Sequence, residues 1–138
     1  MRKNVLTGVT VSLAAAAMIS GTAMAAEYKV GIVQFVDDAS LNQIEKNIEQ
    51  ELTAKSGEGE DTYVFDGYVY NGQADSTTLN QIATQLIDDG VDVIVTIATP
   101  AAQVVQAATE DNQIPVVFSA VSDPVGAGLA ESMDAPGA

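Results

Sequence analysis

The sequence contains neither cysteine nor histidine. The absence of cysteine excludes disulfides, thiolate metal sites, cysteine nucleophiles and the lipid-modified cysteine that anchors lipoproteins. Because histidine is missing as well, the nucleophile–base pairs that most hydrolases use cannot form. We therefore expect no enzyme activity, no cofactor and no metal site.

Positive charge is also scarce. The chain has 5 Lys and Arg residues against 19 Asp and Glu residues, which gives a formal net charge of −14 at pH 7. After residue 25 the cations are Lys29, Lys46 and Lys55, and there is no arginine. Such a field repels nucleic acid and anionic lipid surfaces, so neither is an expected partner. The simplest interpretation of the acidity is solubility.

The first residues have the pattern of a signal peptide. Arg2 and Lys3 make a basic start, residues 5–19 are apolar, and an Ala-Met-Ala sequence ends at Ala25. The apolar run is shorter than the roughly 20 residues that span a bilayer, which argues against an uncleaved membrane anchor. We expect residues 1–25 to be removed by cleavage after Ala25. The product would then be periplasmic or secreted, with no direct membrane insertion.

Four apolar segments in the remaining part have the pattern of buried strands. They cover residues 28–36, 62–70, 91–97 and 115–119, with Gly67 as a possible bulge in the second. Amphipathic segments lie between them, so the order is β-α-β-α-β-α-β with short connections. This order predicts a three-layer, Rossmann-like α/β fold, in which a parallel sheet is covered by helices on both faces. The expected strand order is 2-1-3-4.

Capping residues predict where the helices begin and end. Asp38 or Ser40 should cap the first helix, and Asp75 or Ser76 should cap the second. The polar residues 56–60 read as a loop that ends the first helix.

A ligand site is expected at one edge of this sheet. In such folds ligands bind beyond the carboxyl ends of the strands, where the strand order reverses. The loops that leave this edge cover residues 36–39, 98–101 and 121–124. Three separate stretches of the chain should therefore meet at one crevice.

The start of the third predicted helix is the most informative of these loops. Free N–H groups of Ala101, Ala102 and Gln103 would point at the crevice, with the positive end of the helix dipole behind them. Thr99 would either add a hydroxyl or cap its own helix. This arrangement suits a carboxylate or phosphate, and no basic side chain is placed to do the same.

Acidic residues at the same edge narrow the choice of ligand. Asp37, Asp38 and Asp123 would repel a multiply charged phosphate. Asp38 is better explained as a helix cap, whereas Asp37 is free to face the crevice. A zwitterion fits best, with its carboxylate at the helix start and its ammonium against an aspartate.

Four segments together resemble the tryptophan/tyrosine type of ABC-transporter substrate-binding protein. They read KVGIVQFVD (29–37), LIDDGVDVIV (86–95), IATPAAQ (97–103) and VVFSAVSDPVGAGL (116–129). The resemblance implies that residues 27–138 form the first lobe of a type I periplasmic-binding-protein fold. It also implies an amino-acid ligand, usually aromatic, and partners in the membrane, a permease driven by an ATPase.

The resemblance also implies a set of ligand-binding residues. They lie at strand ends or in the loops of the carboxyl edge: Gln34, Phe35, Asp37, Thr99, Pro100, Ala101, Ser122, Asp123 and Pro124. The ring of Phe35 would either stack on a ligand ring or fill the core at the strand end.

The chain departs from the family pattern in two respects. Relatives carry His-Pro after the acid of the first loop, where this chain has Asp38 and Ala39. Members also run to about twice this length, as two domains of ordinary size require. We therefore expect a truncated protein in which the second lobe and half of the pocket are absent.

Two other functions are compatible with the same fold. One is a small exported enzyme that uses two carboxylates as acid and base. The other is a stand-alone interaction domain that keeps only the inherited architecture.

Overall fold

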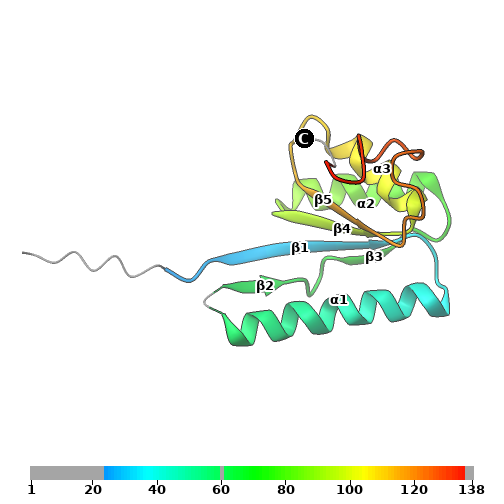
Figure 1. Cartoon of the computed structure of the whole chain (residues 1–138). Coiled ribbons are helices and arrows are strands. Elements are labelled where there is room, and N and C mark those ends of the chain that lie inside the picture. Colours follow the sequence, from blue (N-terminus) through cyan, green and yellow to red (C-terminus); the bar gives the residue numbers. More distant parts are fainter. Residues whose placement is uncertain (1–23, 60, 136–138) are drawn as a thin grey trace, which may run out of the picture.

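The computed structural model describes residues 24–59 and 61–135, so the predicted signal peptide lies almost wholly outside the described part. One sheet runs through the molecule in the order β2-β1-β4-β5, with β3 also paired to β1 (Figure 1). All of these pairs are parallel. The elements in chain order are β1 (Glu27–Gln34), α1 (Ala39–Glu58), β2 (Thr62–Val64), β3 (Val69–Asn71), α2 (Ser76–Asp88), β4 (Val93–Ile97), α3 (Thr99–Thr109) and β5 (Val116–Ser119). The predicted α/β class and the predicted strand order are confirmed.

The predicted strand over residues 62–70 is two short strands rather than one. β2 pairs with the first residues of β1, and β3 pairs with its last three. Between them the backbone turns, since Tyr68 N–H donates to Phe65 O at 2.9 Å and Gly67 has φ of +85°. Only glycine adopts such a φ without strain. The expected bulge at Gly67 is therefore a complete break in the strand.

The first helix is longer than the sequence pattern predicts. α1 continues through Glu58, and Gly59 caps its end with an N–H that donates to Lys55 O at 3.1 Å. Ser56 holds this last turn in place, because its hydroxyl donates to Leu52 O at 2.8 Å and accepts from Tyr63 N at 2.9 Å. The predicted loop over residues 56–60 is thus wrong for its first half.

Of the two candidate caps predicted for each helix, the aspartates cap α1 and α2. The Asp38 carboxylate accepts from the amides of Ser40 and Leu41, and the Asp75 carboxylate accepts from Thr78 N at 2.7 Å. These bonds favour the ionised form, so they lower the pKa of each aspartate; the Ser40 and Thr78 hydrogen bonds are the main causes.

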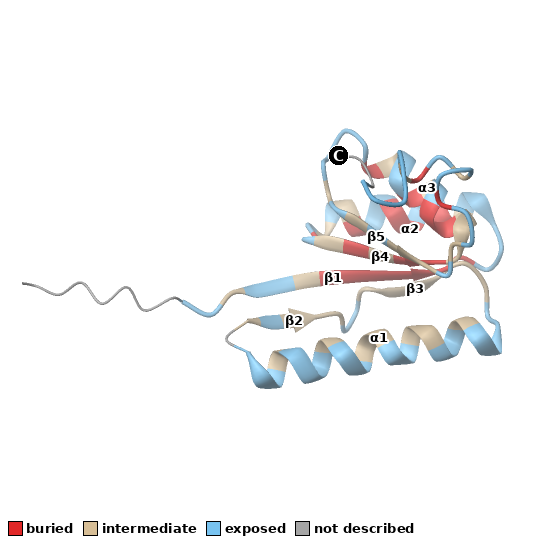
Figure 2. Cartoon of the chain, in the orientation of Figure 1, coloured by how far each residue is buried: buried red, intermediate tan, exposed pale blue. Residues whose placement is uncertain are grey.

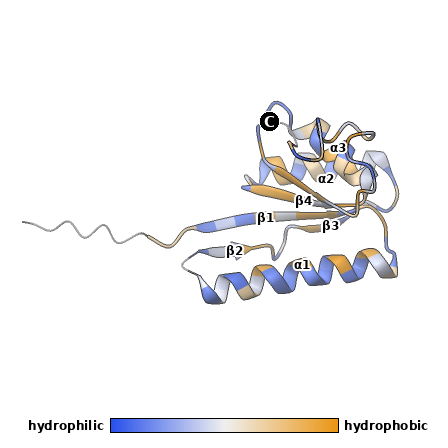
Figure 3. Cartoon of the chain, in the orientation of Figure 1, coloured by the Kyte–Doolittle hydropathy of each residue, from blue (hydrophilic) through white to orange (hydrophobic). Residues whose placement is uncertain are grey.

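The two faces of the sheet are covered unequally (Figure 2). α2 and α3 cover one face and bury their inner side chains in a cluster with Val33 and Ile94. On the other face α1 lies over Val30 and Ile32, and none of its residues, all of which are described, is buried. α1 accordingly has a narrow apolar stripe and a long hydrophilic outer side (Figure 3). At the edge of the sheet, Val117 on β5 keeps 53% of its surface exposed.

None of the described helices is both long enough and apolar enough to cross a bilayer.

Candidate functional site

The carboxyl ends of the strands are tied together by backbone hydrogen bonds. Phe35 N–H donates to Ile97 O at 3.2 Å, which joins the ends of β1 and β4. Ala98 N–H donates to Ser119 O at 3.0 Å, which joins the ends of β4 and β5. The three loops that the sequence places at this edge therefore start from one connected row, on the right in Figure 1.

At the start of α3, the amides that are free are not all the ones that the sequence predicts. The helix is capped by Ala98, with no side-chain hydrogen bond at the cap, so Thr99 is not a cap. The amide of Ala102 donates to Ala98 O at 3.1 Å, and that of Gln103 lies one residue further into the helical ladder. The expectation that these two amides are free is wrong, because the helix starts one residue earlier than a Thr99 cap would require.

Two amides remain without an internal acceptor in the described part of the chain, those of Thr99 and Ala101. Pro100 lies between them and has no N–H to offer. Thr99 is half-buried, whereas Ala101 is fully buried. Thr99 is therefore partly accessible, whereas the Ala101 amide lies inside and adds to the positive end of the helix dipole.

Strained backbone gathers at this edge. Positive φ values occur at four non-glycine residues in the loops after β3, β4 and β5: Gln73, Ala74, Ala98 and Ala120. Ala98 is the extreme case, with φ of +84° and ψ of 152°, a region that is essentially reserved for glycine. Strain of this kind persists where the surrounding structure enforces it, and it is typical of binding sites.

Replacement of Ala98 by glycine should relieve this strain. We expect Ala98→Gly to stabilise the chain by about 1 kcal/mol, after the added freedom of the unfolded chain is subtracted. Ala101→Gly is the matched control, because Ala101 lies in the same helical turn with ordinary helical geometry and should lose about 1 kcal/mol. Urea unfolding of both variants measures the difference; equal losses would show that Ala98 is not strained.

The three acidic residues of the edge have different roles. Asp38 is the α1 cap. Asp123 is turned into its own loop, where its carboxylate accepts from Gly126 N at 2.8 Å. Asp37 is exposed, and one of its oxygens accepts from Asn42 Nδ2 at 2.7 Å. Asp37 is therefore the acid that is held in place, and its second oxygen has no hydrogen-bond partner among the described residues.

Gln34 and Phe35 lie beneath the loops rather than in them. Gln34 is 1% exposed, and its Nε2 donates at 2.6 Å to both Val36 O and Asn42 Oδ1. It therefore braces the loop and the residue that holds Asp37. Phe35 is half-buried and packs against the core under α2 and α3, which favours the core interpretation of its ring.

The last loop supplies the remaining predicted residues. Ser122 is exposed, and Pro124 is buried with its carbonyl accepting from Leu129 N at 2.8 Å. The loop is tied to α3 because Gln103 Nε2 donates to Ala127 O at 3.0 Å.

Sequence reasoning missed Asn42, which joins Gln34 to Asp37. An asparagine in the first turn of a helix, one turn after an aspartate cap, was the available signal. Within residues 24–59 and 61–135, no group of three or more acidic side chains is arranged to hold a metal ion.

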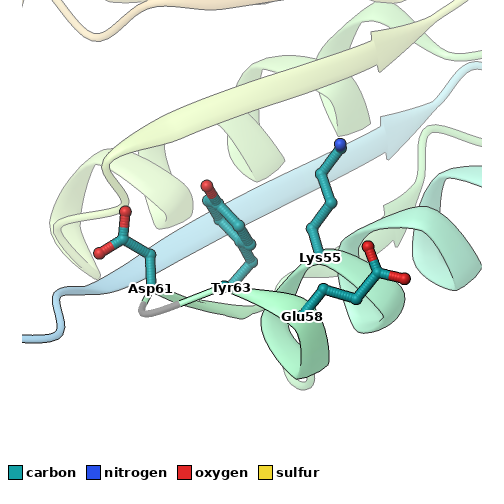
Figure 4. A pocket seen from close by; sticks show the side chains of 5 residues that line it. Lys55, Glu58, Asp61 and Tyr63 are labelled. Carbon is teal, nitrogen blue, oxygen red and sulfur yellow. The ribbon is translucent and has the colours of Figure 1, made fainter.

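Two shallow pockets lie at the opposite, amino-terminal edge of the sheet. One, of about 280 Å³, is lined by Lys55, Glu58, Gly59, Asp61 and Tyr63 (Figure 4). Its neighbour, of about 450 Å³, shares Asp61 and Tyr63 and adds Tyr28, whose ring stacks on Tyr63 with centroids 5.8 Å apart. These pockets are separate from the loops described above.

Comparison with known proteins points in one direction. Residues 29–138 match the family described as ABC transporter substrate binding protein. A tyrosine-binding protein from Clostridioides difficile (strain R20291) is 38% identical over 108 residues, which are 78% of this chain and 30% of that protein. The ABC domain in complex with L-Trp from Streptococcus pneumonia is 33% identical with a TM-score of 0.69, over 80% of this chain and 36% of that one. The ligand-free, open structure of a substrate binding protein with adhesive properties from Clostridium difficile is 32% identical with a TM-score of 0.63. The match covers 77% of this chain and 35% of that one.

The chain spans about a third of the length of these relatives, which is the share expected of a first lobe. Members of the family are exported binding proteins that deliver small molecules to ABC transporters. This chain belongs to the ABC transporter substrate-binding protein family.

Proposed function

We propose that this chain is the amino-acid-binding first lobe of an ABC importer's substrate-binding protein, and that its ligand is aromatic. The ligand's carboxylate is held at the start of α3 by Thr99, and its ammonium is held by Asp37. After export, the loaded protein delivers the amino acid to a membrane permease and its ATPase. The names of the similar proteins, a tyrosine-binding protein and an L-Trp complex, support this ligand class.

The observation that carries the proposal is the start of α3, where the cap residue Ala98 supplies no side-chain hydrogen bond. A helix start attracts anions through its free amides and its dipole, and here the amide and hydroxyl of the half-buried Thr99 have no hydrogen-bond partner in the described chain. The described lysines lie elsewhere: Lys29 is near the start of β1, and Lys46 and Lys55 are on α1. Within the described chain, an anion at this edge would therefore be held by uncharged donors, such as backbone amides and hydroxyl groups.

The ammonium of the ligand requires an acceptor on the same edge. Asp37 follows β1, the strand next to β4 in the sheet, and α3 follows β4 directly. Asn42 fixes one oxygen of Asp37 and Gln34 fixes Asn42, so the free oxygen is pre-oriented. Pre-orientation reduces the entropy that binding must remove.

One lobe leaves the ligand half exposed. Pockets for small molecules normally bury most of the ligand surface, and the longer relatives have the chain length for a second lobe. We therefore expect this chain alone to bind with a dissociation constant of about 1 mM or weaker, near −4 kcal/mol.

Binding at this strength can be measured by titration of backbone amide NMR signals. L-tryptophan should shift the Thr99 amide, whereas tryptamine, which lacks the carboxylate, should not. Indole-3-propionate, which lacks the ammonium, should still shift it. Asp37→Asn should weaken L-tryptophan binding about two- to fivefold, as for an exposed ion pair, and leave indole-3-propionate unchanged.

The matched control is Asp66→Asn, which removes an exposed aspartate in the turn between β2 and β3. It should leave every titration unchanged. If Asp37→Asn weakened the binding of L-tryptophan and of indole-3-propionate equally, the proposed role of Asp37 would be contradicted. A Thr99 amide that moves equally with tryptamine would contradict the carboxylate site.

A further inference from the structure

The fold begins to hold the chain at Ala26. Met24 is 90% exposed and Ala25 is exposed, whereas Ala26 is half-buried. Ala26 N–H donates to Asp61 Oδ1 at 3.1 Å, and Ala26 O accepts from Thr62 N at 2.8 Å. The boundary between free and anchored chain thus coincides with the predicted cleavage site after Ala25.

From this coincidence we infer that removal of the signal peptide creates an ion pair that fastens the start of β1 to β2. Hydrolysis of the Ala25–Ala26 bond adds the hydroxyl of water to the Ala25 carbonyl carbon and a proton to the Ala26 nitrogen. The new amine takes a further proton from solvent at neutral pH, because an α-amino group has a pKa of about 7.7–8.0. The donor at Asp61 changes from a neutral amide to an ammonium, and charged donors make stronger hydrogen bonds.

The surroundings of Asp61 favour a cation. Figure 4 shows Asp61 beside Tyr63 in the pocket at the amino edge, with Tyr63 between Asp61 and the end of α1. Lys55 Nζ lies 3.4 Å from Glu51 Oε1, so the nearby lysine is paired with another acid. The charged and titratable groups at this end of the adjoining elements are Glu27, Tyr28 and Lys29 of β1, Tyr63 of β2, Asp92 before β4, and Lys55 and Glu58 of α1. Acids outnumber bases among them.

The same strand contains a natural control for this pair. Lys29 N–H donates to Asp92 Oδ2 at 2.7 Å, which is again a backbone donor on β1 bonded to an aspartate. Cleavage after Ala25 leaves the Lys29 amide unchanged. A difference between the two aspartates therefore reports on the new terminus rather than on the loss of a carboxylate in general.

The first test is the identity of the terminus. The full chain is expressed with its own signal in a bacterial host, and the exported product is analysed by intact mass spectrometry. We expect a chain that begins with Ala26. A product that begins at any other residue would overturn the inference.

The second test compares Asp61→Asn with Asp92→Asn in two forms of the chain, one that begins at Ala26 and one that retains residues 24 and 25. Pairing should raise the pKa of the terminal amine in the folded state. The ion pair then stabilises the fold fully at pH values below the pKa of the amine in the unfolded chain, about 7.7. This stabilisation is lost as the pH rises through the higher pKa of the amine in the folded chain. At pH 6.5, Asp61→Asn should lower the Tm of the processed form by about 2–4 °C more than that of the extended form.

This excess should shrink as the pH is raised to 9.5. Asp92→Asn should show a smaller excess, because Asp92 lies in the same pocket as Asp61 but accepts its hydrogen bond from the Lys29 amide, which cleavage leaves unchanged. An equal effect of Asp61→Asn on both forms would contradict the inference. NMR titration of the ¹⁵N-labelled terminal amine in the wild-type processed chain gives a readout without mutation. An amine that titrates at or below about 7.7 would also overturn the pairing.

Discussion

Replacement of Gly72 by alanine is expected to destabilise the chain by about 2–3 kcal/mol. A Cβ at this position would overlap Leu79 Cδ2, and it would lie 2.7 Å from Leu79 Cγ and 3.2 Å from Phe35 O. Leu79 is fully buried in the core under α2, so its branch point cannot move aside without displacing the helix. Gly72 also joins two strand ends, because its N–H donates to Gln34 O at 2.7 Å.

Gly57→Ala is the matched control for this substitution. Gly57 lies in the last turns of α1, and a Cβ there would meet nothing within 4 Å. Alanine should therefore add about 0.5–1 kcal/mol of stability, because glycine is a poor helix former. Urea unfolding measures both effects, with the same dependence of the unfolding free energy on urea concentration applied to every variant. A Gly72→Ala chain as stable as the parent would show that Leu79 repacks freely.

Truncation of Leu86 to alanine is expected to cost about 3 kcal/mol. Leu86 is fully buried on the inner side of α2, in the cluster that joins α2 and α3 to the sheet. Its two δ carbons lie 2.9 and 3.0 Å from where a Cβ of Gly31 would be, so the side chain packs directly on the β1 backbone. Its removal leaves a cavity between helix and strand that neither rigid element can close.

A double-mutant cycle with Gly31→Ala tests this packing. In the parent chain the added methyl group pushes on the flexible end of Leu86 and should cost about 1–2 kcal/mol. In the Leu86→Ala chain the same methyl group enters the cavity, so its cost should fall to about zero. Strict additivity of the two substitutions, measured by urea unfolding, would contradict the contact.

Much of the fold could be predicted because hydrophobic periodicity reports directly on burial. The apolar run that ends β1 and the spaced apolar residues of α2 are buried as their patterns require. The strand break at Gly67 could not be placed in the same way, since Tyr and Phe on either side continue a strand-like pattern. The extended end of α1 was missed because Ser56 and Gly57 read as loop residues, whereas the Ser56 hydroxyl is held by Leu52 O within the helix and by Tyr63 N of β2.

The candidate site was predictable to the level of its loops but not of its atoms. The order of the strands brings the ends of β1, β4 and β5 together, and Asp38 caps α1 as its local sequence indicates. The start of α3 depends on a positive φ at Ala98, which alanine in a sequence does not signal. The hydrogen bond from Asn42 to Asp37 depends on the rotamer of the Asn42 side chain, and a sequence pattern does not specify rotamers.

The exposed position of Val117 has a consequence for how this sheet can grow. Among the described strands β5 pairs with β4 alone, so its outer row of backbone groups is open and about half of Val117 is exposed. Additional polypeptide can bond to that row and cover that valine while every existing strand pair stays intact.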